Sequence, residues 1–457
     1  MSVEAFLDAN YPAALEDLKA FCRIPSVSTD PAYAAGIKAA ADFVADRLAR
    51  AGFSNVELLP TGGHPAVFGE ILSDPALPTF LVYGHYDVQP PDPLDKWKTP
   101  PFEPDERDGR LYARGVSDDK GPLLIPILVA EAFVQEEGRL PVNLKVLIEG
   151  EEESGSPHFE PTLERYREKL HCDLVLSADG AMWRPDKPSI TVASRGLVAL
   201  DVTVTGAAKD LHSGRHGGSA PNPIAALAVL IASMHGPDGR VSVDGFLDGT
   251  SSPDPRIIAA IEAANFDSAA YYREIGVERP VPIDTGRELL IRQWLEPTLE
   301  FNGISGGYQG RGTKTVIPNA ASVKITCRLI AGQKPDAVIV AITRHLEKCL
   351  PNGFRLDVHR HGPGSEADFI DPDLPAFRAS EEVLGELLGQ KPLRVAMGAT
   401  IPIGGAFRKH LGCASIFFSF STADEDYHAP NEFFRLENFR LGMKAWTMLL
   451  RRLAAAR

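Results

Sequence analysis

The sequence predicts an α/β layered domain that is interrupted by a smaller, inserted α+β domain. Apolar strands alternate with helices over residues 1–193, whereas the strands of residues 194–367 alternate apolar with polar side chains. The alternation of apolar strands with helices returns over residues 368–457. Alternation of strands and helices is typical of a sheet covered by helices. We therefore predict one discontinuous domain, residues 1–193 and 368–457, into which residues 194–367 are inserted.

The helices at the start of the chain are marked by apolar residues at helical spacing. This spacing covers residues 3–23 and 35–51, and Gly52 provides an ordinary helix stop. A third helix opens at Gly121-Pro122 and reaches about residue 135, with proline in the first turn, where it costs least. The strands predicted from runs of β-forming residues are 66–71, 79–84, 111–114, 142–148 and 173–177.

In the inserted part, apolar and polar residues alternate more strictly along the predicted strands, which is typical of half-buried strands. Its predicted strands are 195–206, 321–330 and 354–361, and its predicted helices are 220–236 and 336–350. This order suggests a small α+β domain. Residues 237–300 are rich in Pro, Asp and Gly and support no assignment. The elements predicted to complete the outer domain are a helix near 375–389, a strand at 414–420 and a helix at 432–455.

Composition and charge exclude several classes of protein. The 457 residues carry a formal net charge of −14 and no basic stripe, so a nucleic-acid partner is not expected. The five cysteines form no CxxC pair, which excludes a zinc finger or dithiol redox centre. No apolar run approaches the ~20 residues of a membrane span. The N-terminus has no basic segment followed by an apolar one. We expect a cytoplasmic protein without a membrane partner.

Histidine and acidic side chains follow five apolar runs that are typical of buried strands. They are His85, Asp118, Glu152 with Glu153, Asp179, and His428. Strand ends on one edge of an α/β sheet converge in space. Two histidines with several carboxylates predict a metal site. They favour a site for two metal ions over a site for a single ion. Each residue alone has an ordinary alternative: a loop histidine, a helix cap, a solvated acidic loop or an Asp-Gly turn.

Three further segments carry candidate substrate contacts. His212 lies in a glycine-rich turn, KDLHSGRHGG, from which it could donate to a developing oxyanion. Thr315 and Arg328 lie in GTKTVIPNAASVKITCRLI, and an arginine there could bind a substrate carboxylate with two hydrogen bonds. Thr400 lies in the glycine-rich loop at 398–407, which lacks the GxxxxGK[ST] pattern of nucleotide sites. An ordinary loop histidine and a surface salt bridge remain the alternatives for His212 and Arg328.

Taken together, these segments resemble the M20 metallopeptidase family, and within it the cytosolic, carnosine-dipeptidase-like branch. The segments that carry the resemblance are GHYDVQP, SDDKGP, EGEEESGS, LHSG, GYQGRGTKTVIP and DEDYHAPNE, in family order. They span nearly the whole chain. The resemblance implies a di-zinc exopeptidase-like catalytic domain and an inserted α+β lid and dimerisation domain.

The resemblance also implies roles for the predicted metal ligands. Asp118 would bridge two zinc ions in each subunit, in place of which Mn²⁺ or Co²⁺ could bind. His85 and Asp179 would complete the ligands of one ion, and Glu153 and His428 those of the other. Glu152 would be the general base, and Asp87 would orient His85. The Asp118–Asp119 peptide bond would be cis.

For the inserted domain, the resemblance implies a lid that joins two subunits in a homodimer. His212 would reach the partner's active site as an oxyanion donor, together with Thr315. Arg328 and Thr400 would hold the C-terminal carboxylate of a small peptide.

Three alternatives remain open at this point. Glu151 precedes Glu152 where relatives often have an apolar residue, so the base could be shifted by one position. An N-acyl-amino-acid deacylase or desuccinylase of the same family would share the metals and the base. A catalytically silent binding protein could keep the fold without activity, although every candidate residue is present in this sequence.

Overall fold

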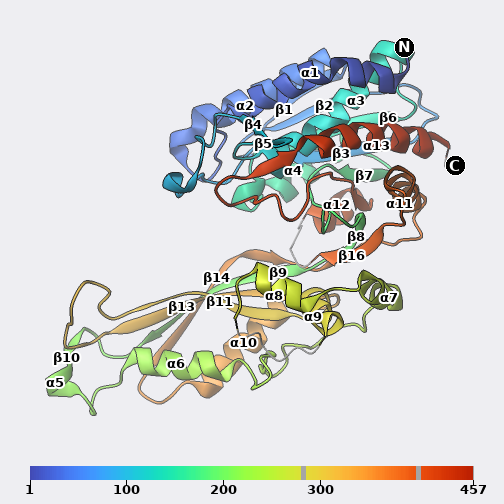
Figure 1. The fold of residues 1–457 in the computed structure, drawn as a ribbon. Helices are drawn as coiled ribbons and strands as arrows, with labels where there is room; N and C mark the ends of the chain where they lie inside the picture. The colour runs from blue at the N-terminus through green and yellow to red at the C-terminus, as the bar shows by residue number, and fades with distance from the viewer. Residues whose placement is uncertain (279–284, 398–402, 456–457) are drawn as a thin grey trace. The chain divides into compact units, whose positions relative to one another are not determined.

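The structure is a computed structural model that describes residues 1–278, 285–397 and 403–455 (Figure 1). The chain forms two compact units. Unit 1 contains Met1–Val192, Ile370–Val395 and Ala406–Arg457, and unit 2 contains Ala193–Phe369 and Ala396–Gly405. The predicted insertion, 194–367, did not include the second of the two segments in unit 2. The catalytic role of the first unit and the lid and dimerisation role of the second stay predictions.

Unit 1 is built on a six-stranded sheet with the order β1-β2-β6-β3-β7-β17. Its strands are β1 (Ser54–Leu59), β2 (Ala66–Ile71), β3 (Thr79–His85), β6 (Asn143–Glu149), β7 (Leu174–Ser177) and β17 (Ser415–Phe417). Strands β6, β3, β7 and β17 are parallel, whereas β1 and β2 run antiparallel at one edge. Every residue of β6 is buried, as expected for a strand covered on both faces.

Helices cover both faces of this sheet. On one face, Leu48 of α2 packs against Gly69, and Leu123 of α3 packs against Gly84. Each leucine occupies space that a Cβ atom at the glycine would need. On the other face, the ring of Tyr83 contacts Phe159 of α4 and Phe407 of α12. The helices of unit 1 are α1 (Val3–Cys22), α2 (Ala34–Arg50), α3 (Gly121–Glu137), α4 (Phe159–Arg165), α11 (Pro375–Leu388), α12 (Ile403–Leu411) and α13 (Leu436–Ala455). The α/β prediction is therefore confirmed.

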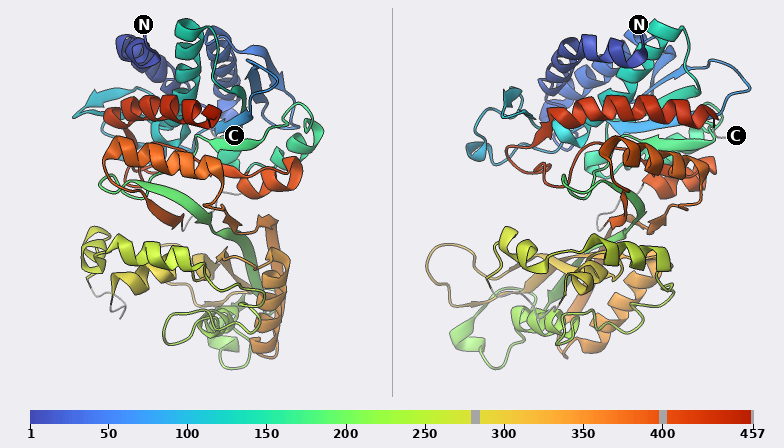
Figure 2. Two further views of the ribbon diagram at one scale, coloured as in Figure 1. Left: turned by 90° about the vertical axis from the view of Figure 1, so that its right-hand side faces the viewer. Right: turned by 45° about the vertical axis from the view of Figure 1, so that its right-hand side comes forward.

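The first and last helices of the chain lie side by side in the same layer (Figure 2). Tyr11 of α1 packs against Phe439 of α13, with ring centroids 6.1 Å apart. The C-terminal segment thus belongs to the same core as the N-terminal one.

Unit 1 also contains a small antiparallel sheet with the order β18-β5-β4. Its strands are β4 (Asp105–Arg107), β5 (Arg110–Tyr112) and β18 (Phe433–Arg435). The helix predicted at 432–455 therefore begins later, at Leu436, because Phe433–Arg435 pair with β5. The strand predicted at 414–420 is shorter, since only Ser415–Phe417 pair with β7.

Unit 2 contains an antiparallel sheet with the order β11-β13-β9-β14. Its strands are β9 (Gly196–Thr205), β11 (Thr298–Gly306), β13 (Ala320–Leu329) and β14 (Arg355–Ser365). Helices α6 (Pro223–Ser233) and α10 (Pro335–Cys349) pack on one face, and Leu200, Leu230 and Ile342 belong to the shared core. The alternation of β9, in which every second residue is buried, produces this one-sided core.

In the described residues of the region without an assignment, 237–300, there are three helices and part of β11. The helices are α7 (Pro255–Ala264), α8 (Ser268–Glu274) and α9 (Gly286–Trp294). The remaining elements are β8 (Ser189–Ser194), β10 (Leu211–His212), β12 (Val316–Ile317), β15 (Asp368–Phe369), β16 (Leu393–Met397), α5 (Ser213–His216), and the short turns η1 (Pro31–Tyr33), η2 (Leu94–Lys96), η3 (Val116–Lys120) and η4 (Glu152–Ser154).

Within the described ranges, none of the helices is both long enough and apolar enough to cross a membrane. The cytoplasmic location stays a prediction.

Candidate metal centre and active site

The side chains of the candidate centre gather at one edge of the six-stranded sheet in unit 1. His85 is the last residue of β3, Glu152 and Glu153 lie in the turn η4 after β6, and Asp179 follows β7 by two residues. Because β3 is parallel to both β6 and β7, these ends lie next to one another. The long loop after β17 brings His428 to the same group.

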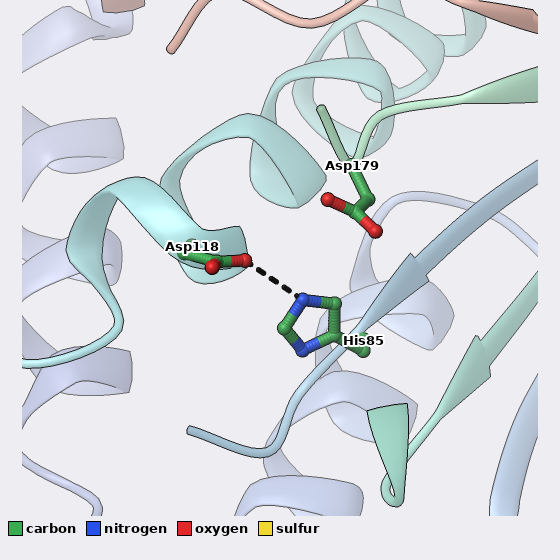
Figure 3. A group of neighbouring side chains, drawn as sticks. All are labelled: His85, Asp118 and Asp179. Atoms are coloured by element: carbon green, nitrogen blue, oxygen red, sulfur yellow. Dashed lines mark hydrogen bonds and ion pairs between the residues drawn. The ribbon is translucent and has the colours of Figure 1, made fainter. Parts of the chain in front are cut away.

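Asp118 reaches this group by a different route from the predicted one. The expectation that it follows a strand of the same sheet is wrong, because β5 belongs to the small sheet β18-β5-β4. Asp118 lies in η3, between β5 and the start of α3, with backbone angles outside the helical range. Its peptide bond to Asp119 is cis, as the resemblance implied. Figure 3 shows Asp118 and Asp179 converging with His85 from separate elements.

The described side chains form two groups that could each hold a metal ion, and both contain Asp118. His85, Asp118 and Asp179 form one group, and Asp118, Glu153 and His428 form the other, with ligand atoms within 4.8 Å of one another in each. Asp118 Oδ1 lies 3.0 Å from His85 Nε2, and Asp118 Oδ2 lies 2.9 Å from His428 Nε2. The two oxygens of one carboxylate thus face two different groups, which is the arrangement of a bridging ligand.

The charges of these groups are not balanced by the described protein residues alone. Burial raises the pKa of Glu152 and of Glu153, and it raises the pKa of Asp179 to about 6. Burial also raises the pKa of Asp119, and the Oδ1 atom of Asp119 has no hydrogen-bond partner among the described residues. For Asp118 burial acts in the same direction, but hydrogen bonds with His428 and His85 outweigh it and hold the pKa below its usual range.

So many buried or partly buried carboxylates cost free energy unless cations compensate them. The mixture of imidazole and carboxylate ligands suits Zn²⁺, and Mn²⁺ or Co²⁺ prefer similar donors. The residues present therefore fit a pair of divalent cations. Glu153 is 3% exposed but His428 is 52% exposed, so the second group is open to solvent on the histidine side.

The role of Asp87 differs in detail from the predicted one. The nearest acceptor to His85 Nδ1 is the backbone carbonyl oxygen of Asp87, at 3.0 Å, and the Asp87 carboxylate lies 3.5 Å away. This carboxylate accepts the backbone N–H groups of Glu152 and Glu153, at 3.2 and 3.1 Å. Asp87 thus holds both the histidine and the turn that carries the two glutamates.

The third glutamate, Glu151, is turned away from both metal groups. Its Oε2 atom lies 2.9 Å from His158 Nδ1. Its Oε1 atom lies only 2.0 Å from the point where a Cβ would stand at Gly63, so that glycine allows the close packing. Glu151 is therefore a hydrogen-bond partner of His158.

Sequence reasoning missed Gln89. The Nε2 atom of Gln89 donates to Glu153 Oε2 at 2.7 Å and to the Glu153 carbonyl oxygen at 3.3 Å. Gln89 lies in the same GHYDVQP segment as His85 and Asp87, but nothing in the sequence links it to a glutamate 64 residues later. It orients one predicted metal ligand.

Three of the other predicted site residues, His212, Thr315 and Arg328, lie in unit 2. His212 of β10 pairs with Val316 of β12, and the backbone N–H of Ser213 donates to the Thr315 carbonyl oxygen at 3.1 Å. The Nδ1 atom of His212 accepts the N–H of Gly214 at 3.0 Å. A neutral His212 therefore carries its proton on Nε2. Both His212 and Thr315 are exposed.

Arg328 lies on β13, on the face of the sheet opposite the core. Burial lowers the pKa of Arg328. Burial and the charge of Arg328 together lower the pKa of Arg195 to about 10, whereas Glu300 acts in the opposite direction. Two partly buried guanidinium groups thus lie near one another. Thr400 lies outside the described residues.

The family to which the chain belongs is decided by its sequence. The sequence model described as "Peptidase family M20/M25/M40" matches residues 81–452. The chain belongs to this peptidase family. The resemblance stated above and the assignment as a hydrolase of the metallopeptidase class are therefore confirmed.

Relatives of this peptidase carry dipeptidase names. It is 33% identical over 384 residues to the Beta-Ala-His dipeptidase of Homo sapiens, covering 83% of this chain and 76% of that protein. It is 30% identical over 448 residues to the Cys-Gly metallodipeptidase dug1 of Schizosaccharomyces pombe, covering 94% of each.

Solved structures of the family share the fold of this peptidase. Human carnosine dipeptidase 1 matches with a TM-score of 0.86 and 30% identity, over 99% of this chain and 98% of that one. The M20 family metallo-carboxypeptidase Sso-CP2 of Sulfolobus solfataricus matches with a TM-score of 0.88 and 29% identity, over 97% and 99%. The predicted fold class is thus confirmed.

Proposed function

We propose that this peptidase hydrolyses dipeptides that have a free C-terminal carboxylate, in a metal-dependent reaction. The observation that carries the proposal is the pair of ligand groups that share Asp118, with the partly buried Glu152 beside them. Relatives named for Beta-Ala-His and Cys-Gly dipeptides support this choice of substrate. We propose zinc as the metal and two ions per subunit, held by His85, Asp118, Glu153, Asp179 and His428.

Divalent cations at this site, when bound, supply Lewis acidity that acidifies water and polarises the scissile carbonyl. Glu152 then takes the proton of the attacking water and delivers it to the leaving amine. The backbone N–H of Glu152 is held by Asp87, which also fixes His85. The base is thus positioned by the same residue as one metal ligand. Because Glu151 is engaged with His158, Glu152 is the better candidate for the base.

We propose that His212 stabilises the oxyanion of the tetrahedral intermediate, together with Thr315. The Nε2 proton of a neutral His212 is available for donation because Nδ1 is already an acceptor. Pairing of β10 with β12 holds the backbone of His212 beside that of Thr315.

We propose that unit 2 forms a homodimer contact, so that His212 serves the active site of the partner. The exposed large apolar side chains of unit 2 include Ile224 and Val229 of α6, Ile304 of β11 and Tyr308 just after β11. A Cβ at Gly307 would lie 3.0 Å from Ile224 Cδ1, so the helix and the strand end are neighbours. Exposed apolar patches of this kind are typical of interfaces.

Mixing two inactive variants tests this arrangement. His212→Ala is expected to lower kcat by about 10²–10³-fold, the usual loss for an oxyanion donor. When it is mixed with Glu152→Gln under conditions that exchange subunits, activity is expected to reappear. A mixed dimer would combine the intact Glu152 of one subunit with the intact His212 of the other. Heterodimers seen by native mass spectrometry without any activity would show that His212 does not act across the interface.

We propose that Arg328 binds the C-terminal carboxylate of the substrate, with Thr400 as a second contact. The nearby guanidinium group of Arg195 adds to the positive charge at this place. The partial burial of Arg328 strengthens its attraction to an anion.

Replacing Arg328 with Ala is expected to raise KM for dipeptides by about 10–100-fold, because a charged hydrogen bond contributes ~1.5–3 kcal/mol. Hydrolysis of C-amidated dipeptides is expected to change little. Lys324→Ala is the matched control, because Lys324 lies on the same face of the same strand and pairs with Asp201. Equal losses on free and amidated dipeptides would contradict the carboxylate contact.

The proposed function is tested by hydrolysis of a substrate panel with and without chelator. The panel contains free dipeptides, C-amidated dipeptides, and N-acetyl and N-succinyl amino acids. Chelator-sensitive cleavage of the free dipeptides is the expected result. Cleavage of the acylated amino acids alone would make the protein a deacylase. No cleavage by protein that holds two metals would favour a catalytically silent binding protein.

A further inference from the structure

The segment that carries Asp118 has an irregular backbone. Gly115 has a φ of +78°, and a Cβ there would lie 2.1 Å from Val88 Cγ1, so that only glycine fits. Asp118 itself departs from helical geometry, with φ of −128° and ψ of 92°. The N–H of Val116 donates to the Ala113 carbonyl oxygen, and that of Lys120 to the Gly115 carbonyl oxygen. The N–H groups of Gly115, Ser117 and Asp118 instead donate to a side chain from elsewhere in the fold, so the orientation of this backbone depends on that contact.

Those contacts come mainly from one buried carboxylate, Glu432, which is 1% exposed. Glu432 Oε1 accepts the N–H of Ser117 at 2.9 Å and the N–H of Asp118 at 3.2 Å. Its Oε2 atom accepts the N–H of Gly115 at 2.8 Å and lies 2.7 Å from the guanidinium of Arg114. One side chain therefore accepts three backbone N–H groups within residues 115–118, and the guanidinium of Arg114, the residue before them, compensates its charge.

The position of Glu432 follows from strand pairing. β18 pairs with β5 such that Phe433 lies opposite Tyr112, and the N–H of Ala113 donates to the Glu432 carbonyl oxygen at 3.2 Å. Hydrogen bonds outside this strand pairing also join the two segments of the chain. Ser421 Oγ donates to the Ser117 carbonyl oxygen at 2.6 Å, and Ser117 Oγ donates to Glu425 Oε2 at 2.7 Å.

We propose that Glu432 is a positioning residue for the bridging ligand: it holds the backbone of residues 115–118 so that one oxygen of Asp118 faces His85 and the other faces His428. His428 lies only four residues before Glu432, in the same segment. The chain segment that supplies one metal ligand therefore also anchors the ligand that both ions would share. This inference rests on the proposed role of Asp118 as a bridge between two cations.

The chemistry of a carboxylate suits this task better than that of an amide. Glutamate offers two acceptor oxygens, which here meet three N–H groups and a guanidinium. Glutamine keeps the shape but offers one oxygen, and its NH₂ group would point at N–H donors. Glu432→Gln is therefore expected to fold while allowing the 115–118 segment to shift.

The test is a metal titration of metal-free Glu432→Gln and wild type with Zn²⁺, followed by calorimetry and by metal analysis after dialysis. The expected result is a loss of about 10–100-fold in affinity for both ions, the range found when side chains that orient metal ligands are replaced. kcat at limiting zinc should fall in parallel and recover partly at excess zinc. A lesion that only destabilises the fold would lower the melting temperature but leave the zinc affinity of the folded protein unchanged.

The control is Lys145→Met, which removes two partly buried hydrogen bonds from Lys145 Nζ to the carbonyl oxygens of Lys169 and His171, away from the centre. It should lower the melting temperature without changing zinc affinity. Wild-type zinc affinity in Glu432→Gln would overturn the inference and leave the proposed function standing. Wild-type protein that binds no zinc would instead overturn the proposed function. If Glu432→Gln does not fold, Glu432→Asp, which keeps the charge but has a shorter reach, is judged by the same titration.

Discussion

Replacing Glu152 with Gln is expected to leave both metal positions filled and to lower kcat by about 10²–10⁴-fold, the contribution typical of a general base. Glu152 belongs to neither metal group among the described residues, yet it lies beside both, partly buried and near His85, Asp118 and Asp179. Glutamine is nearly the same size, so the turn held by Asp87 should keep its shape. What is lost is the ability to accept a proton.

The sequence provides a matched control one residue away. Glu151→Gln changes an equally similar side chain in the same turn, but its carboxylate pairs with His158. We expect Glu151→Gln to keep most of the activity. Metal analysis of both variants, with kcat measured on a free dipeptide, checks the pair. Retained activity in Glu152→Gln, or an equal loss in Glu151→Gln, would move the base to another residue.

The second large effect is expected from Asp118→Asn, which should weaken the binding of both ions. The two oxygens of Asp118 lie 3.0 and 2.9 Å from the two histidines of separate groups. Removing the charge therefore affects both positions at once. We expect affinity losses above the ~10–100-fold that is typical of residues outside the ligand set, and activity should fall with metal content.

Two further variants distinguish a bridged pair from a single ion. Asp179→Asn changes only the group with His85, and Glu153→Gln changes only the group with His428. Each should weaken one of two binding events in a titration, whereas Asp118→Asn should weaken both. A single binding event in wild type, affected alike by all three substitutions, would show that one ion binds instead of two.

Several site residues could be predicted from sequence because strand ends of a parallel sheet share an edge. His85, Glu152 and Asp179 follow β3, β6 and β7, and the apolar runs of these strands are plain in the sequence. Asp118 was predicted to join them for a wrong reason. Its strand, β5, pairs with a strand from the far end of the chain, and no local signal reports such a pairing.

The supporting residues were the hardest to predict. Gln89 and Glu432 act through contacts with residues 64 and more than 300 positions away. Such contacts depend on how chain segments fold back on one another. Glu151 and Glu152 likewise have the same chemistry and adjacent positions, and only the turn η4 sends one to His158 and the other to the centre.

The sequence by itself determined the alternation of strands and helices, the interruption by a second set of alternating strands, and the residue types that a metallopeptidase centre requires. These features depend on local periodicity and on chemistry that each residue carries with it. Only the tertiary structure decided which oxygen of Asp118 faces which histidine, which glutamate faces the centre, and which buried carboxylate holds the bridging segment. Those outcomes depend on hydrogen bonds between segments that are distant in the chain, and such bonds form only when the whole domain packs.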